Sequence, residues 1–89
     1  MPYGIASFRS RQQVFAFESI LKRSGVRAQI VSTPREVALG CGLSVRFELG
    51  EAGRVSDLYR RSQPQNLIGF YRVEPRANMR PLLAPMQMM

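Results

Sequence analysis

Cys41 is the side chain of this sequence best suited to chemistry, because it is the only cysteine and lies between two glycines, Gly40 and Gly42. Glycine has no side chain to shield a neighbouring sulfur, and it permits positive φ angles. The two glycines therefore predict a loop in which a partner can reach the thiol. The alternative is that Cys41 is buried as a small hydrophobic residue, as free cysteines often are.

Two arginines close in sequence, Arg35 and Arg46, bear on the reactivity of this thiol. The thiolate is the nucleophilic form of cysteine, and nearby cations favour it. We therefore expect Cys41 at the surface end of a strand, partly reachable and with an arginine nearby. Such a thiol reacts with iodoacetamide faster than a buried cysteine, whereas a sulfur enclosed by apolar side chains is inert until the protein unfolds.

The composition excludes several other kinds of chemistry. The 89 residues contain no histidine, which excludes histidine-based general base catalysis and the common zinc sites. The sequence shows no acid/base pair and no phosphate-binding loop, so we expect neither an enzyme nor a cofactor or metal. One cysteine cannot form an internal disulfide, which favours a reducing cytoplasm. No apolar run approaches the roughly 20 residues of a membrane span, and no signal peptide is predicted.

The net charge of +7 favours anionic partners, and twelve of the thirteen basic residues are arginine. The arginines are spread along the chain without a basic block, which is also typical of a solvated basic surface. We expect weak binding to nucleic acid that falls steeply with salt and shows no sequence preference.

The hydrophobic pattern predicts alternating strands and helices up to residue 74. Ser10 and Gln13 fit a helix capping box, and Gly25 ends the helix that follows. Thr33 as N-cap, Pro34 at the first helical position and Glu36 at the box position predict a capped turn that fixes the Cys41 loop. The predicted strands cover 3–8, 26–30, 43–47 and 67–74, and the predicted helices cover 11–24 and 50–62.

This order, β-α-β-β-α-β, predicts an α+β fold of the ferredoxin-like type. We expect a four-stranded antiparallel sheet with both helices on one face, formed by residues 1–74. Residues 75–89 contain three prolines and four methionines without periodicity. They predict a tail that packs little onto its own domain, and is either disordered or paired with another chain.

Three segments in this order carry a resemblance to a known family: Thr33–Glu36, Cys41-Gly42 leading into the strand Leu43–Phe47, and the closing strand Tyr71–Val73. Together they resemble the selenium/sulfur carrier-like family over about residues 3–74. The chain departs from a typical member in its excess of arginine and in its extension after Glu74.

The resemblance implies that Cys41 is a carrier thiol. It would hold sulfur or selenium as a persulfide or selenopersulfide, taken from a donor protein and passed to an acceptor protein. Gly40, Gly42, Arg35 and Arg46 would support it.

Two other functions stay open. A basic ferredoxin-like sheet is also typical of RNA-recognition modules, although their aromatic signature is absent here. The chain could instead be a non-catalytic regulatory module that forms homo-oligomers through its open sheet face or its tail.

Overall fold

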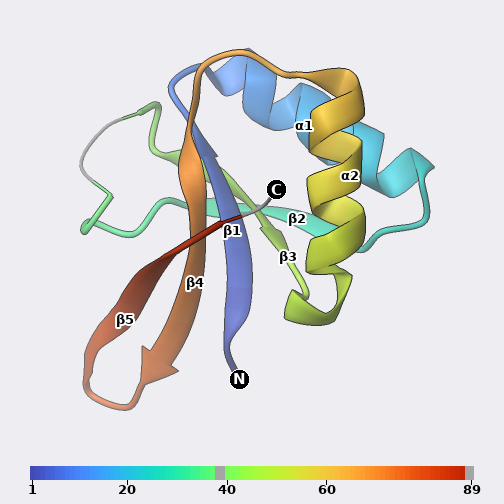
Figure 1. Ribbon diagram of the computed structural model, residues 1–89. Helices are drawn as coiled ribbons and strands as arrows, with labels where there is room; N and C mark the ends of the chain where they lie inside the picture. Colours follow the sequence, from blue (N-terminus) through green and yellow to red (C-terminus); the bar gives the residue numbers. More distant parts are fainter. Residues whose placement is uncertain (38–39, 88–89) are drawn as a thin grey trace.

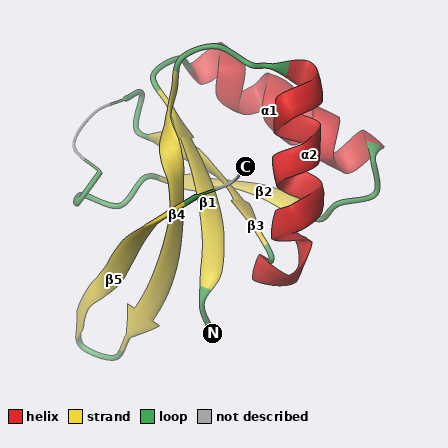
Figure 2. Ribbon diagram, in the orientation of Figure 1, coloured by secondary structure: helices red, strands yellow, loops and turns green. Residues whose placement is uncertain are grey.

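The chain forms one antiparallel sheet of five strands, with two helices packed on one side of it (Figures 1 and 2). The structure is a computed structural model and describes residues 1–37 and 40–87. The strand order is β2-β3-β1-β4-β5, and every neighbouring pair is antiparallel. The elements are β1 (Tyr3–Phe8), α1 (Arg11–Arg23), β2 (Ala28–Ser32), β3 (Leu43–Phe47), a 3-10 turn (Leu49–Glu51), α2 (Ala52–Ser62), β4 (Leu67–Arg76) and β5 (Met79–Met86).

Helix α1 begins and ends where the sequence predicts. Ser10 is the N-cap residue, although its side chain makes no capping hydrogen bond. Gly25 adopts a φ of +83°, and the Val26 N–H donates to the Leu21 carbonyl at 2.9 Å, which closes the last turn. The apolar stripe of this helix, Val14, Phe17 and Leu21, is fully buried against the sheet.

Aromatic side chains from four elements form the centre of the core between the helices and the sheet. Phe17 of α1 lies 5.6 Å from Phe8 of β1 and 6.2 Å from Tyr59 of α2, measured between ring centroids. Tyr59 lies edge-on to Phe70 of β4 at 5.3 Å. Such tilted and edge-to-face pairs add to the burial of apolar area, so this cluster fixes both helices to the same face of the sheet.

The fifth strand corrects two predictions. The sheet has five strands, not four, and the predicted tail is wrong for residues 79–86, which pair with β4 as β5. The prolines favour the prediction of an irregular tail, but an edge strand tolerates proline at positions where the backbone nitrogen faces away from the neighbouring strand. Pro81 and Pro85 lie four positions apart on this edge strand, while Met86 packs against the core. Residues 88–89 lie outside the described residues.

The segment after Thr33 forms a turn, closed by the Val37 N–H donating to the Pro34 carbonyl at 3.0 Å. The sequence predicts a capped turn over residues 34–39, and the end of that segment, residues 38–39, lies outside the described residues. The described part of this segment forms a single turn.

Candidate functional site

Cys41 lies in the loop that leads into β3 and is half-buried. Its Sγ is 3.7 Å from the Leu43 carbonyl oxygen, and its backbone N–H donates to the Phe8 carbonyl at 3.4 Å. The side chain packs against the edge of the helix-side core. The Cys41 backbone is therefore hydrogen-bonded to the end of β1, and the residue as a whole is partly exposed.

The two glycines that flank Cys41 both have positive φ, but they are needed for different reasons. Gly40 has a φ of +118°, and a Cβ built on it would lie 2.8 Å from the Phe8 carbonyl oxygen. Gly42 has a φ of +87°, and no atom lies within 4 Å of a Cβ built there. Gly40 thus allows close approach to β1, whereas Gly42 supplies only the left-handed backbone.

The base of the Cys41 loop is held by hydroxyl groups and not by a helix cap. The Thr33 N–H donates to the Gly42 carbonyl at 2.9 Å, which extends the β2–β3 ladder by one residue pair. The Thr33 hydroxyl lies 2.7 Å from the Ser44 hydroxyl, which lies 2.8 Å from that of Ser7. Thr33 does fix the loop, but by this chain of hydroxyls in place of the predicted N-cap.

Glu36, the predicted capping-box residue, pairs instead with β5. Its carboxylate accepts two hydrogen bonds from Arg80, at 3.0 Å from Nε and 2.9 Å from Nη2. The hydrogen bond from Arg80 is the main reason that the pKa of Glu36 is lowered, and the charge of Arg35 contributes least. This pair connects the Cys41 loop to an edge strand 44 residues away in sequence.

The two arginines predicted to lie near the Cys41 thiol, Arg35 and Arg46, are in different parts of the fold. Arg46 lies between the core residues Val45 and Phe47 on β3, so its side chain belongs to the sheet face away from the helices. There its guanidinium carbon lies 3.9 Å from the centroid of the Tyr3 ring. Cys41 packs on the helix side, so the structure does not bring Arg46 to the thiol.

Arg35 is an exposed residue of the turn beside Glu36, and it has no ion-pair partner among the described residues.

Three residues that contact the Cys41 loop or its base were not predicted from the sequence: Ser7, Ser44 and Arg80. Only the alternation of β1 and β3 could have indicated that Ser7 and Ser44 share a face.

The described residues contain no cluster of three or more metal-ligating side chains. Neither helix in the described part of the chain has the length and apolar character needed to cross a membrane.

The architecture defines a small α+β domain with one cysteine that lies between two glycines, beside the end of β1 and just before β3. A family model, described as "Putative Se/S carrier protein-like", matches residues 3–71, and the chain belongs to that family. The matched region contains Cys41 and all three hydroxyl residues, but not β5. No curated protein and no solved structure matches the chain significantly.

Proposed function

We propose that the protein is a sulfur or selenium carrier, not an enzyme, and that Cys41 is the carrier thiol. The observation that carries this proposal is the position of the cysteine. It is the only thiol of a chain that belongs to the carrier-like family, and it is half-exposed in a loop fixed to β1 and β3. A group carrier needs both properties, because a partner must reach the sulfur and the loaded group must be presented in a defined position.

The transfer balances without any added oxidant or reductant. The Cys41 thiolate attacks the outer sulfur of a persulfide on the donor protein, forming a new S–S bond. The old S–S bond breaks, and the donor cysteine leaves as a thiolate. In the second step a nucleophile of the acceptor attacks the same outer sulfur, and Cys41 leaves as the thiolate. A selenopersulfide follows the same sequence with selenium as the transferred atom.

The absence of a second cysteine in the sequence supports storage of the cargo. A neighbouring thiol could attack the inner sulfur of the persulfide and release the cargo while forming a disulfide. With a single cysteine, this loss is not available within one chain. A reducing compartment such as the cytoplasm suits this chemistry, and the partners are donor and acceptor proteins for sulfur or selenium.

The test is the intact mass of the protein after incubation with a cysteine desulfurase and cysteine. We expect a gain of one sulfur atom that dithiothreitol reverses and that the Cys41→Ser variant does not show. A parallel incubation with a selenocysteine lyase and selenocysteine distinguishes the two cargoes. Unchanged mass in both incubations, with a folded protein, contradicts the carrier function.

We also assign the first four strands and two helices to the ferredoxin-like type, with β5 as an added strand. The order β2-β3-β1-β4 and the two β-α-β units support this assignment.

A nucleic-acid-binding module is the second candidate, favoured by one observation. Tyr3 and Tyr71 are on the sheet face away from the helices, on the adjacent strands β1 and β4, and Arg46 stacks on Tyr3. Exposed aromatic rings and arginines on a sheet are the groups on which bases stack. Tight oligonucleotide binding that persists at high salt, without any loading of Cys41, favours this candidate over the carrier.

A further inference from the structure

The two edges of the sheet differ in whether they can accept another strand. β5 forms one edge, and its prolines at 81 and 85 remove two donors from the outward side. β2 forms the other edge, and its sequence from Ala28 to Ser32 contains neither proline nor a charged residue. The β2 edge therefore lacks the usual features that block pairing with a further strand.

The backbone groups that β2 presents outward follow from its register with β3. Thr33 pairs with Gly42 and donates its N–H to the Gly42 carbonyl. Hydrogen-bonded and free positions alternate along an antiparallel strand. Gln29 and Val31 therefore face β3, whereas the N–H and C=O groups of Ala28, Ile30 and Ser32 point away from the sheet.

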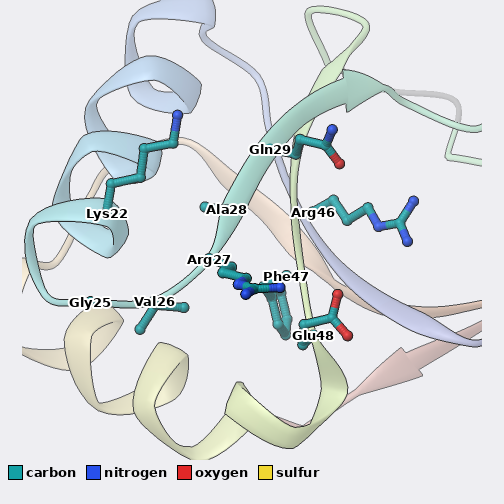
Figure 3. Close-up of a pocket in the computed structure, with 9 residues that line it drawn as sticks. All are labelled: Lys22, Gly25, Val26, Arg27, Ala28, Gln29, Arg46, Phe47 and Glu48. Carbon is teal, nitrogen blue, oxygen red and sulfur yellow. The ribbon is translucent and has the colours of Figure 1, made fainter.

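A basic groove of about 590 Å³ adjoins the start of this edge (Figure 3). Lys22 of α1 lines one side, and Arg27, the residue before β2, and Gln29 of β2 also line the groove. Arg46 of β3 and Glu48, the residue after β3, also line the groove, but the Arg46 side chain points away from Lys22 and Arg27 in Figure 3. Lys22 is paired with Glu18 at 2.7 Å, but neither Arg27 nor Arg46 forms an ion pair with any described residue.

We propose that the β2 edge and its basic groove form a docking site for an extended acidic segment of a partner protein. The segment adds a sixth strand antiparallel or parallel to β2, through the outward groups of Ala28, Ile30 and Ser32. Its carboxylates lie against Arg27, which directly precedes β2. A second copy of this chain does not fit, because each copy carries a net charge of +7 and brings the same cations to the contact.

The direction of β2 gives this site a relation to Cys41. The strand ends at Ser32, and the next residue, Thr33, forms the base of the Cys41 loop. A segment docked along β2 therefore extends from the basic groove toward the thiol. This relation matters for a sulfur carrier, but the docking itself does not depend on the proposed function.

The test is the binding of a fluorescein-labelled peptide of four Glu-Val repeats, measured by fluorescence polarisation at low and at raised salt. We expect saturable binding that weakens with salt, and no binding of the matched Lys-Val peptide. Arg27→Glu is expected to weaken binding by about fivefold or more. Arg11→Glu, which makes the same charge change on an exposed residue outside the groove, serves as the matched control and leaves binding nearly unchanged.

The pairing itself is tested by amide hydrogen exchange and by a proline variant. Bound peptide is expected to slow exchange at Ala28, Ile30 and Ser32. Ala28→Pro removes an outward donor at the first residue of the strand, where proline is tolerated, and is expected to abolish binding. The exchange measurement decides the question if this variant does not fold.

Three results overturn the proposal. Equal binding of the acidic and basic peptides shows that charge does not select the segment. Protection at other amides places the site elsewhere. A single-stranded oligonucleotide that shifts the β2 amides while the acidic peptide does not assigns this edge to nucleic acid. These outcomes are independent of whether Cys41 loads sulfur.

Discussion

Replacing each glycine beside Cys41 with alanine tests whether the loop is fastened to β1 as the structure indicates. Both residues have positive φ, which costs a residue with a Cβ about 1–2 kcal/mol. The loss of chain entropy in the unfolded state offsets about 0.4–1 kcal/mol of this cost. Gly42→Ala meets no neighbouring atom, so we expect it to lower the free energy of unfolding by about 1 kcal/mol.

Gly40→Ala carries a second cost. Its Cβ would lie 2.8 Å from the Phe8 carbonyl oxygen, and this backbone group belongs to a fully buried residue of a central strand. Overpacking of this kind costs roughly 1–3 kcal/mol. The contact also involves the carbonyl that accepts the Cys41 N–H, so the loop must move away from β1. We therefore expect a total loss of about 3 kcal/mol.

Urea denaturation at equilibrium measures both losses, with the slope of the transition checked for each variant. The comparison between the two variants is more informative than either value alone, because both make the same chemical change at positive φ. Equal losses for Gly40→Ala and Gly42→Ala would refute the close packing of the loop against β1.

Three further predictions concern the contacts that hold the loop. Ser44→Ala is expected to lower the free energy of unfolding by about 1–3 kcal/mol, because it leaves the buried Ser7 hydroxyl without its partner; the Ser7→Ala/Ser44→Ala double variant is expected to lose no more, and a larger loss contradicts the pairing. The lowered pKa of Glu36 means that its pairing with Arg80 stabilises the fold above the usual titration range of a glutamate and is lost as pH falls through that range and below it. Melting temperatures of wild type and Glu36→Gln are therefore expected to differ at neutral pH and to converge in acid, and a constant difference is the contrary result. Arg80→Met is expected to speed alkylation of Cys41 by iodoacetamide by less than about fivefold, because it removes the pair with Glu36. The control is Arg72→Met, which breaks an exposed pair with Glu74 and is expected to leave the alkylation rate unchanged. Equal alkylation rates in both variants would argue that Arg80 does not hold the loop.

The sequence predicted those parts of the fold in which a local pattern and a long-range contact agree. β1 and β3 have the predicted bounds, because β1 is a short apolar run and β3 alternates apolar and polar residues, each between clear breaks. Helix α1 begins after Ser10 and ends before Gly25, because its apolar residues have helical spacing between these two end signals. The start of β2 was placed two residues early, since Val26 is buried beside the helix end and not in the strand.

β5 could not be recognised from its own sequence, because its stability comes from pairing with β4 and not from a strand-like composition. Prolines normally indicate the absence of a strand, but at an edge they remove only outward donors. The left-handed Asn78, with a φ of 58°, closes the turn between β4 and β5. That turn brings Arg80 into reach of Glu36, a contact that no local pattern encodes.

The site was predicted in its position but not in its contacts. Gly40 and Gly42 do create the loop around Cys41, as their sequence positions indicate. Thr33 and Glu36 have the spacing of a capping box, but their side chains bond to Ser44 and Arg80 instead. Arg46 is near Cys41 in sequence but lies on the other face of the sheet. Side chains of successive strand residues point to opposite faces, so a short separation in sequence does not place two side chains together.

The central claim is that Cys41 holds a transferable sulfur or selenium atom, and its most direct test is the state of the thiol in protein taken from cells. The chain is isolated without oxygen, trapped with iodoacetamide and fragmented for mass spectrometry. The carrier function predicts a fraction of Cys41 with one extra sulfur or selenium atom between Sγ and the trapping group, absent after treatment with dithiothreitol. Cys41 recovered only as the singly alkylated thiol, in cells and after incubation with a desulfurase, contradicts the carrier function.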